Sequence, residues 1–298
     1  MSSTMLQLVQ QGTSEMGLSV PASVAGNLST DTIQQLALMN ACGYELQRKY
    51  NWNALTLQNI FQVNVLTLTA NSTAQSVNLT SASTIIGVTN QFQVSGLGIN
   101  QATYVVSASG STIVLSQPAT GNNNGATYTL TQTIYPMPVG FDRQIDCTHW
   151  DKSKHWQMLG PESAQQWEWL LSGYISTGPR IRYRILGGNF EIWPAVGVNE
   201  VLGFEYLTSA WAASSGGTAK TSFTADTDTC IYPDRLMVLF FKHKYFQVKG
   251  LGDIFASDFE EELGMAKTND QGSPTLAMSP QASNVLITWN NIPDTIPQ

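Results

Sequence analysis

The 298-residue sequence lacks charge over almost a third of its length. No Asp, Glu, Lys or Arg occurs from Tyr50 through Phe141, although typical chains carry about 25% charged residues. Within this window, Val63 to Thr131 is rich in Thr, Ser, Asn and Gly, and short apolar alternations such as Thr112 to Leu115 are separated by glycine turns. The pattern predicts strands of about four to six residues. We therefore expect an all-β sandwich or barrel inserted at residues 63–131.

The absence of charge bears on how this insert avoids aggregation. Exposed edge strands normally carry Lys or other charges that prevent unwanted pairing. An all-neutral module lacks this protection, which indicates that neighbouring subunits cover its edges. Alternatively, hydroxyl and amide groups alone keep its surface soluble. Both interpretations make the insert structural.

Cysteine is scarce, and long apolar runs are missing. Cys42, Cys147 and Cys230 are too few and too scattered for a disulfide framework, and none lies in a Cys-x-x-Cys pair. We expect them to be buried reduced thiols. No stretch approaches roughly 18 consecutive apolar residues, and Met1 to Gln11 lacks the basic start and apolar run of a signal peptide. We expect a protein made and kept in a cytoplasm, without a membrane partner.

Basic residues are outnumbered, with 14 Lys and Arg against 21 Asp and Glu and a net charge of −7. This is the wrong sign for a protein that grips phosphates tightly, so any passing DNA should make only transient non-specific contacts. Arg180, Arg182 and Arg184 alternate in one predicted strand. Repeated around a ring, they would form a positive band facing DNA or an adjacent subunit. The alternative is the solvated face of a half-buried strand.

No set of residues suggests catalysis. The sequence has no Gly-x-Ser-x-Gly motif and only three histidines, of which His149 and His155 flank tryptophans in a predicted loop. Asp226 and Asp228 could share a hard cation, but the other ligands of a calcium loop are missing, which favours turn capping. We predict no enzyme activity, no metal and no cofactor.

Helical periodicity lies on both sides of the neutral window. One helix is expected to end near Gly17, and a second to run from the Ser29 region to about Tyr50. A third is expected to begin at Pro161, a residue favoured in a first helical turn. Its apolar stripe leaves Trp169 on another face, as a candidate subunit interface.

Two more helices are expected from Pro233, broken near Gly250. In the second of these, acidic residues lie opposite the apolar face, and we take them as further candidates for a subunit interface. They are Asp258, Glu261 and Glu262.

A small antiparallel sheet is expected between the third and fourth helices. Arg180 to Ile185 alternates and is joined through a glycine turn to Phe190 to Trp193. We expect Val201 to Tyr206 to complete the sheet.

The last residues contain four prolines and no helical pattern, which predicts an extended C-terminal arm at 271–298 or, alternatively, a disordered tail. Its apolar run needs a surface to pack on, and we expect that surface to be a portal protein or an adjacent subunit. The run consists of Val285, Leu286, Ile287 and Trp289. The fold class is therefore α+β, with a helical-bundle core of residues 1–62 and 132–270.

Segments of this core resemble the head-to-tail adaptor proteins of podovirus-like bacteriophages, also called head-completion or tail tubular proteins. The resemblance covers about residues 5–62 and 132–270 and rests on the order and spacing of short motifs. The first motifs are Leu8-Val9-Gln10-Gln11, Glu15-Met16-Gly17-Leu18, Tyr50-Asn51-Trp52, Tyr135-Pro136-Met137-Pro138 and Phe141-Asp142-Arg143. The later motifs are Leu159-Gly160-Pro161, Trp167-Glu168-Trp169, Gly178-Pro179-Arg180 and Phe223-Thr224-Ala225-Asp226-Thr227-Asp228. The neutral insert resembles a β module that recurs in phage structural proteins.

The resemblance implies a virion protein at the head-tail junction, assembled in the cytoplasm of a bacterial host. It implies a homo-oligomeric ring of about twelve subunits. Such a ring would dock under the portal protein, meet the tail nozzle or tube protein and continue the DNA channel. The Ser, Thr and Asn content of the insert motivates an alternative from another class, a receptor- or glycan-binding tail component. A third alternative is a peptidoglycan hydrolase carried in the tail.

Overall fold

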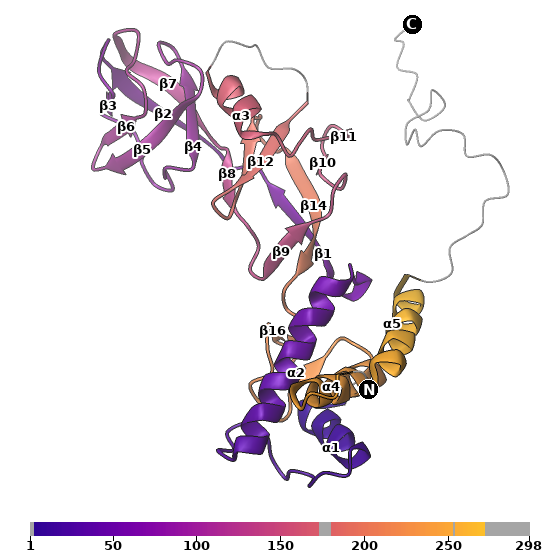
Figure 1. Cartoon of the computed structure of the whole chain (residues 1–298). Helices are drawn as coiled ribbons and strands as arrows, with labels where there is room; N and C mark the ends of the chain where they lie inside the picture. The colour runs from indigo at the N-terminus through magenta and orange to yellow at the C-terminus, as the bar shows by residue number, and fades with distance from the viewer. Residues whose placement is uncertain (1–2, 173–179, 253, 272–298) are drawn as a thin grey trace, which may run out of the picture.

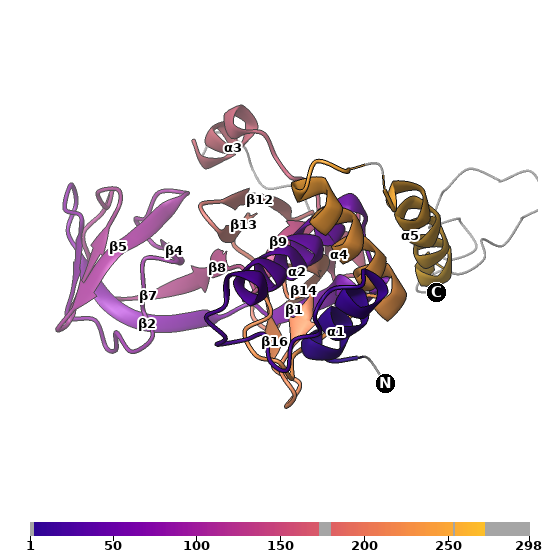
Figure 2. The same cartoon turned by 60° about the horizontal axis from the view of Figure 1, so that its bottom comes forward.

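A computed structural model of the chain describes residues 3–172, 180–252 and 254–271. The expected α+β fold is present in these residues, with five α-helices, several antiparallel sheets and a closed six-stranded barrel. The molecule is elongated: the barrel lies at one end, most helices lie at the other, and two sheets lie between them (Figure 1, Figure 2). None of the described helices is long and apolar enough to cross a membrane.

Four helices and three short strands make up what we call the helical body. Its elements are α1 (Met5–Glu15), α2 (Thr30–Lys49), α4 (Asp234–Val248), α5 (Ala256–Gln271), β15 (Ala212–Ala213), β16 (Ala219–Lys220) and β17 (Thr229–Cys230). Local signals explain where the helices begin: Thr4 and Gln7 form a capping box at α1, and the Ser29 hydroxyl accepts from Thr32 N at α2. The expected break between the last two helices is also present.

The helices pack closely because small residues lie where large rings cross them. Gly43 in α2 lies directly against the indole of Trp211, and a Cβ on Gly12 in α1 would approach the Phe241 ring to 2.7 Å. The centre of α4, from Leu236 to Phe241, is buried on all sides. The helical body therefore depends on close packing more than on the amphipathicity of single helices.

Lys242 places a buried charge in this core. Lys242 is almost fully buried, and its Nζ lies 2.8 Å from Glu15 Oε2 and 4.1 Å from the centroid of the Phe255 ring. Burial alone would raise the pKa of Glu15, but hydrogen bonds from Lys242, Gln11 and Arg235 hold it at about 2. The carboxylate thus stays charged and compensates the buried lysine.

Two sheets facing one aromatic core make up what we call the sheet body. The larger sheet has the order β1-β14-β10-β11, and β9 pairs with the far end of β14. Its strands are β1 (Thr56–Gln62), β9 (Phe141–Gln144), β10 (Trp150–Asp151), β11 (Trp156–Gln157) and β14 (Val201–Thr208). The smaller sheet consists of β8 (Ile134–Pro136), β12 (Arg182–Leu186) and β13 (Asn189–Trp193). Phe190, Phe204 and Tyr183 fill the space between the two sheets.

The structure corrects the sheet topology expected from the sequence. Val201 to Tyr206 does not join the hairpin of β12 and β13, where β8 supplies the third strand. The segment pairs instead with β1 over seven residues, Thr56↔Leu207 through Gln62↔Val201. β14 is mostly buried and needs long partners, and β1 matches its length.

The barrel consists of six antiparallel strands in the closed order β2-β3-β6-β5-β4-β7. They are β2 (Val65–Ser72), β3 (Asn78–Thr80), β4 (Phe92–Gly96), β5 (Thr103–Ser109), β6 (Thr112–Leu115) and β7 (Asn123–Gln132). Alternate residues such as Leu68, Leu79 and Ile113 fill its interior. Because a closed barrel has no edge strands, the argument that neighbouring subunits must cover its edges was wrong.

The barrel leaves and rejoins the sheet body at one place. β2 and β7 are paired along most of their length, and at their base Gln132 N donates to Asn64 O at 2.8 Å. The helix α3 (Ala164–Leu171) makes a second contact between the barrel and the sheet body. Its Trp167 packs with Ala102 of the barrel and Trp193 of the sheet body.

The expected start of this third helix at Pro161 was wrong. Leu159 N donates to Ile181 O and Glu162 N donates to Tyr183 O, so this segment lies alongside β12. Ser163 is the N-cap instead, in a capping box with Gln166. The expected stripe of Trp167 and Leu170 is buried.

Arg143 connects the helical body to the sheet body. It follows Asp142 in β9, and its Nη2 donates to Gln47 O (3.3 Å), Tyr50 O (3.5 Å) and Asn51 Oδ1 (2.8 Å) at the end of α2. A guanidinium here satisfies carbonyls that no helical N–H reaches, at the negative end of the helix dipole.

We therefore expect Arg143→Met to lower the free energy of unfolding by about 2 kcal/mol, because it removes charge-assisted hydrogen bonds but keeps the side-chain bulk. Arg48→Met is the matched control, since Arg48 is exposed in the last turn of the same helix. Urea denaturation followed by circular dichroism measures both variants. Equal effects would show that Arg143 does not join the two bodies.

Candidate functional site

The larger sheet presents one face to the core and the other to solvent. Along β14, Leu202, Phe204 and Tyr206 point into the core, and Gly203 and Glu205 lie on the opposite, outer face because side chains alternate in a strand. Gly203 has room only for hydrogen, because a Cβ there would lie 2.6 Å from Lys152 Cε. The stem of the lysine therefore covers the strand.

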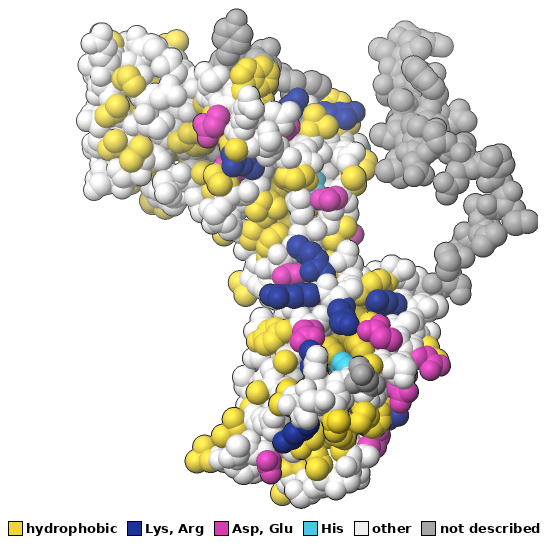
Figure 3. Space-filling view, in the orientation of Figure 1, with side chains coloured by type: hydrophobic (Ala, Val, Ile, Leu, Met, Phe, Trp, Pro, Cys, Tyr) yellow, Lys and Arg dark blue, Asp and Glu magenta, His cyan; other side chains and the backbone are white. Residues whose placement is uncertain are grey.

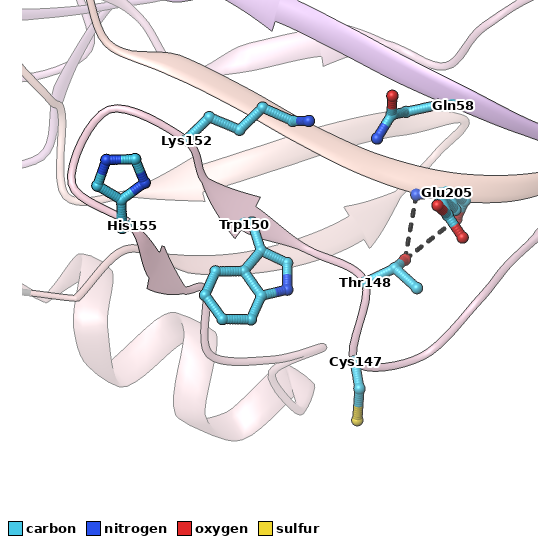
Figure 4. A pocket seen from close by; sticks show the side chains of 7 residues that line it. All are labelled: Gln58, Cys147, Thr148, Trp150, Lys152, His155 and Glu205. Atoms are coloured by element: carbon cyan, nitrogen blue, oxygen red, sulfur yellow. Dashed lines mark hydrogen bonds between the residues drawn. The ribbon is translucent and has the colours of Figure 1, made fainter. Parts of the chain in front are cut away.

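An open pocket of about 430 Å³ lies on this outer face. Its lining residues come from β1, β14 and the segment around β10, and they are Gln58, Cys147, Thr148, Trp150, Lys152, His155 and Glu205 (Figure 4). Thr148 holds this segment to β14: its Oγ1 accepts from Glu205 N at 3.1 Å and donates to Ile145 O at 2.7 Å. The pocket thus combines an aromatic wall, one amine and one carboxylate.

The groups in this pocket are not arranged for nucleophilic catalysis. His155 and Cys147 lie on opposite sides of Trp150 (Figure 4), whereas a thiol nucleophile needs its base within hydrogen-bonding reach. Cys147 is exposed, so the expectation that all three cysteines are buried holds only for Cys42 and Cys230.

β1 borders the pocket through Gln58 and forms a free edge of the sheet. Among the described residues, its strand pairing is with β14 alone. Leu57 is 45% exposed and Ile60 is 51% exposed. The strand carries no charged residue, although edge strands usually use charge to prevent pairing with other chains.

His149 belongs to the aromatic core and not to the pocket. Its ring stacks on Tyr183 at 4.0 Å and on Phe204 at 5.2 Å between centroids. Neither ring nitrogen has a hydrogen-bond partner in the described structure. Burial lowers the pKa of this imidazole to about 4, although the Asp146 carboxylate opposes the shift.

The three arginines do not form a continuous positive band. Arg180 precedes β12 and is exposed, so the expectation of three arginines within one strand was wrong. Arg182 Nη1 lies 2.6 Å from Glu162 Oε1, and Arg184 is the cross-strand partner of Glu191. Two of the three charges therefore lie beside carboxylates of their own chain.

The two aspartates that could have shared a cation bind backbone instead. Asp226 accepts from Val24 N and Ala25 N at 3.0 and 2.7 Å, which anchors the loop before α2. Asp228 is buried and forms an ion pair with Lys220 at 2.8 Å. These contacts fit the expected capping role, and no cluster of metal-binding side chains occurs among the described residues.

The other candidate interface residues lie on separate parts of the molecule. Asp258, Glu261 and Glu262 lie on α5 at the helical end, whereas Trp169, which is 50% exposed, lies on α3 beside the barrel. The structure therefore does not bring these residues into one surface. Val285, Leu286, Ile287 and Trp289 lie outside the described residues.

No protein-family model matches the chain, and no curated protein is significantly similar to it.

Sequence reasoning missed the most informative surface, the edge strand β1 and the pocket beside it. A weak signal was present, because Leu57, Ile60 and Phe61 are interspersed with uncharged polar residues in a segment of strand length. The lack of charge drew attention to the insert, although the same window also includes β1. Lys152 could not have been placed from the sequence, since its position depends on pairing between β10 and β14.

Proposed function

We propose that this protein is a structural virion subunit, an adaptor that forms a ring on the portal protein and connects the phage head to the tail. The observation that carries the proposal is an elongated chain with exposed apolar side chains at both ends. At the helical end Leu28 is 89% exposed, and at the barrel end Ile86 is 85% exposed. Large apolar side chains exposed at two distant places favour a subunit that meets different partners at each end.

Hydrophobic side chains gather at the tip of the helical body near the start of α2 (Figure 3). Val20 and Ile33 are each 53% exposed and come from the loop before α2 and from its first turns. The motifs that resemble the adaptor family are concentrated in the helical and sheet bodies. We therefore assign the helical end to the portal side, and the barrel end to the tail nozzle or tube protein.

The proposed relation to DNA is passive. The net charge is −7, and two of the three candidate arginines lie beside carboxylates of their own chain. A channel built from such subunits repels phosphates more than it binds them, which allows DNA to slide.

The test is the mass of the purified protein, alone and with portal rings of the same phage, by light scattering and negative-stain microscopy. We expect a monomer that becomes a stoichiometric collar on the portal. Leu28→Asp should abolish the collar, because a charge would be buried at the portal contact. Ile86→Asp at the barrel end is the matched control and should leave it intact.

Two results would contradict the proposal. A failure to associate with portal at any salt concentration would favour the alternative, a receptor- or glycan-binding tail component. That alternative predicts binding of the barrel segment on a glycan array. Cleared zones in a peptidoglycan zymogram would instead favour a hydrolase.

A further inference from the structure

The free edge of β1 has the features that an added polypeptide strand requires. Backbone N–H and C=O groups on the open side of a sheet edge are unpaired donors and acceptors. For residues Thr56–Gln62, the described structure contains no backbone hydrogen bond on the side away from β14. The absence of charge and the exposure of Leu57 and Ile60 remove the usual obstacles to strand addition.

We propose that residues 284–290 of the same chain occupy this edge as an additional strand in the free subunit. The segment reads Asn-Val-Leu-Ile-Thr-Trp-Asn, and Pro280 and Pro293 are the nearest prolines on either side. Valine, isoleucine, threonine and tryptophan favour strands, and proline disfavours them. An extended conformation would place Val285, Ile287 and Trp289 on one face.

The described chain ends next to the proposed site. Asp270, in the last turn of α5, accepts from Asn53 N at 2.7 Å, and its carbonyl accepts from Asn53 Nδ2 at 2.8 Å. Asn53 lies three residues before β1. The chain therefore leaves the helical body within a few residues of the edge strand.

The linker is long enough for either strand direction. Thirteen residues, 272–284, separate Gln271 from Val285, and an extended chain spans roughly 3.3 Å per residue, or about 40 Å in total. The seven residues of β1 span only about 23 Å. A short tether also gives an effective concentration in the millimolar range, which favours this segment over a second copy at micromolar concentration.

The absence of charge on both segments is compatible with the same occupant. From Gly272 to Pro293 the chain carries no charged residue, and β1 carries none either. On the outer face, Ile60 of β1 is half exposed and lies next to the stem of Lys152 over Gly203, whereas Trp150 lies on the far side of β14. Apolar side chains that alternate along an added strand can pack on this surface.

The test is residue-resolved amide exchange by NMR on the full chain. Wild-type protein should protect every second amide of β1, those on the side away from β14. Ile287→Pro should speed their exchange about tenfold or more, since proline cannot donate to the ladder. Ala277→Pro, in the same uncharged stretch but outside 284–290, is the matched control and should keep wild-type protection. Equal exchange in all three proteins would overturn the proposal.

A cysteine experiment separates the chain's own segment from a neighbour's. In a Cys147→Ser background, Ile287→Cys is combined with Gln58→Cys, Ile60→Cys or Gln62→Cys, so that each register is sampled. We expect an intramolecular disulfide with one of these positions and none with Leu28→Cys, at the other end of α2. Disulfides formed only between chains, or equally with both ends of α2, would overturn the assignment. The inference concerns the free chain and does not depend on portal binding.

Discussion

Gly43→Ala is expected to lower the free energy of unfolding by about 2 to 3 kcal/mol. A Cβ at this position would overlap the indole of Trp211, and Trp211 is itself held by Tyr44, Phe223 and Tyr232. Neither partner can move without displacing the core of the helical body, so the overlap produces strain. The strain exceeds the roughly 1 kcal/mol by which alanine normally stabilises a helix relative to glycine.

Gly264→Ala is the matched control, because it makes the same change in the helix α5. No atom lies within 4 Å of a Cβ built at Gly264, so we expect an increase in stability of about 0.5 to 1 kcal/mol. Thermal and urea unfolding of both variants measure the difference. Two changes of the same sign would show that the contact between α2 and Trp211 is looser than described.

Acid is expected to destabilise the sheet body between about pH 6.5 and pH 4 through His149. The pKa of the folded imidazole is about 4, against 6.5 for an unperturbed histidine. As the pH falls, the unfolded chain takes up a proton first, so the stability present above pH 6.5 is lost towards pH 4. The shift corresponds to a loss of about 3 kcal/mol at most.

The measurement is the urea midpoint as a function of pH for two variants. His149→Phe should remove the loss in this window, because the stack with Tyr183 accepts another aromatic ring. His155→Phe should retain it, since His155 is exposed. The ion pairs of Glu15, whose pKa is about 2, contribute separately, and their stability is lost only below about pH 4.5. If the urea midpoint of His149→Phe fell with pH as steeply as that of the wild type between pH 6.5 and pH 4, this account would be contradicted.

Local patterns predicted most of the elements but not how the elements pair. Caps at Ser29, periodicity in α2 and the alternation of the neutral window each depend on neighbouring residues, and the helices and barrel strands follow from them. The start of α3 was misplaced because Pro161 fits a first helical turn, yet its neighbours bond to β12. Which strand joins which sheet depends on contacts between residues distant in sequence, and β14 carries no local mark of its partners.

For the candidate site too, the sequence predicted local features but not those that depend on strand pairing. The lack of charge from Tyr50 onwards was visible, but only the pairing of β1 with β14 makes that lack a property of a free edge. The arginines stood out in the sequence, but the ion pair of Arg182 with Glu162 and the placement of Arg184 opposite Glu191 depend on how β12 pairs with β13 and on the segment before α3.

The single entry point of the barrel has an evolutionary consequence. The chain leaves the sheet body after Val63 and returns at Thr133, and Gln132 N and Asn64 O lie 2.8 Å apart. A module whose two ends meet across one hydrogen bond can be gained, exchanged or deleted without stretching the host chain. The barrel also contacts its host beside this entry point, through Ala102 under α3, through Val65 and through Thr131, whose Oγ1 lies 3.5 Å from Val196 O. The barrel is therefore the part of this chain that could change most without altering the pairing of the remaining strands.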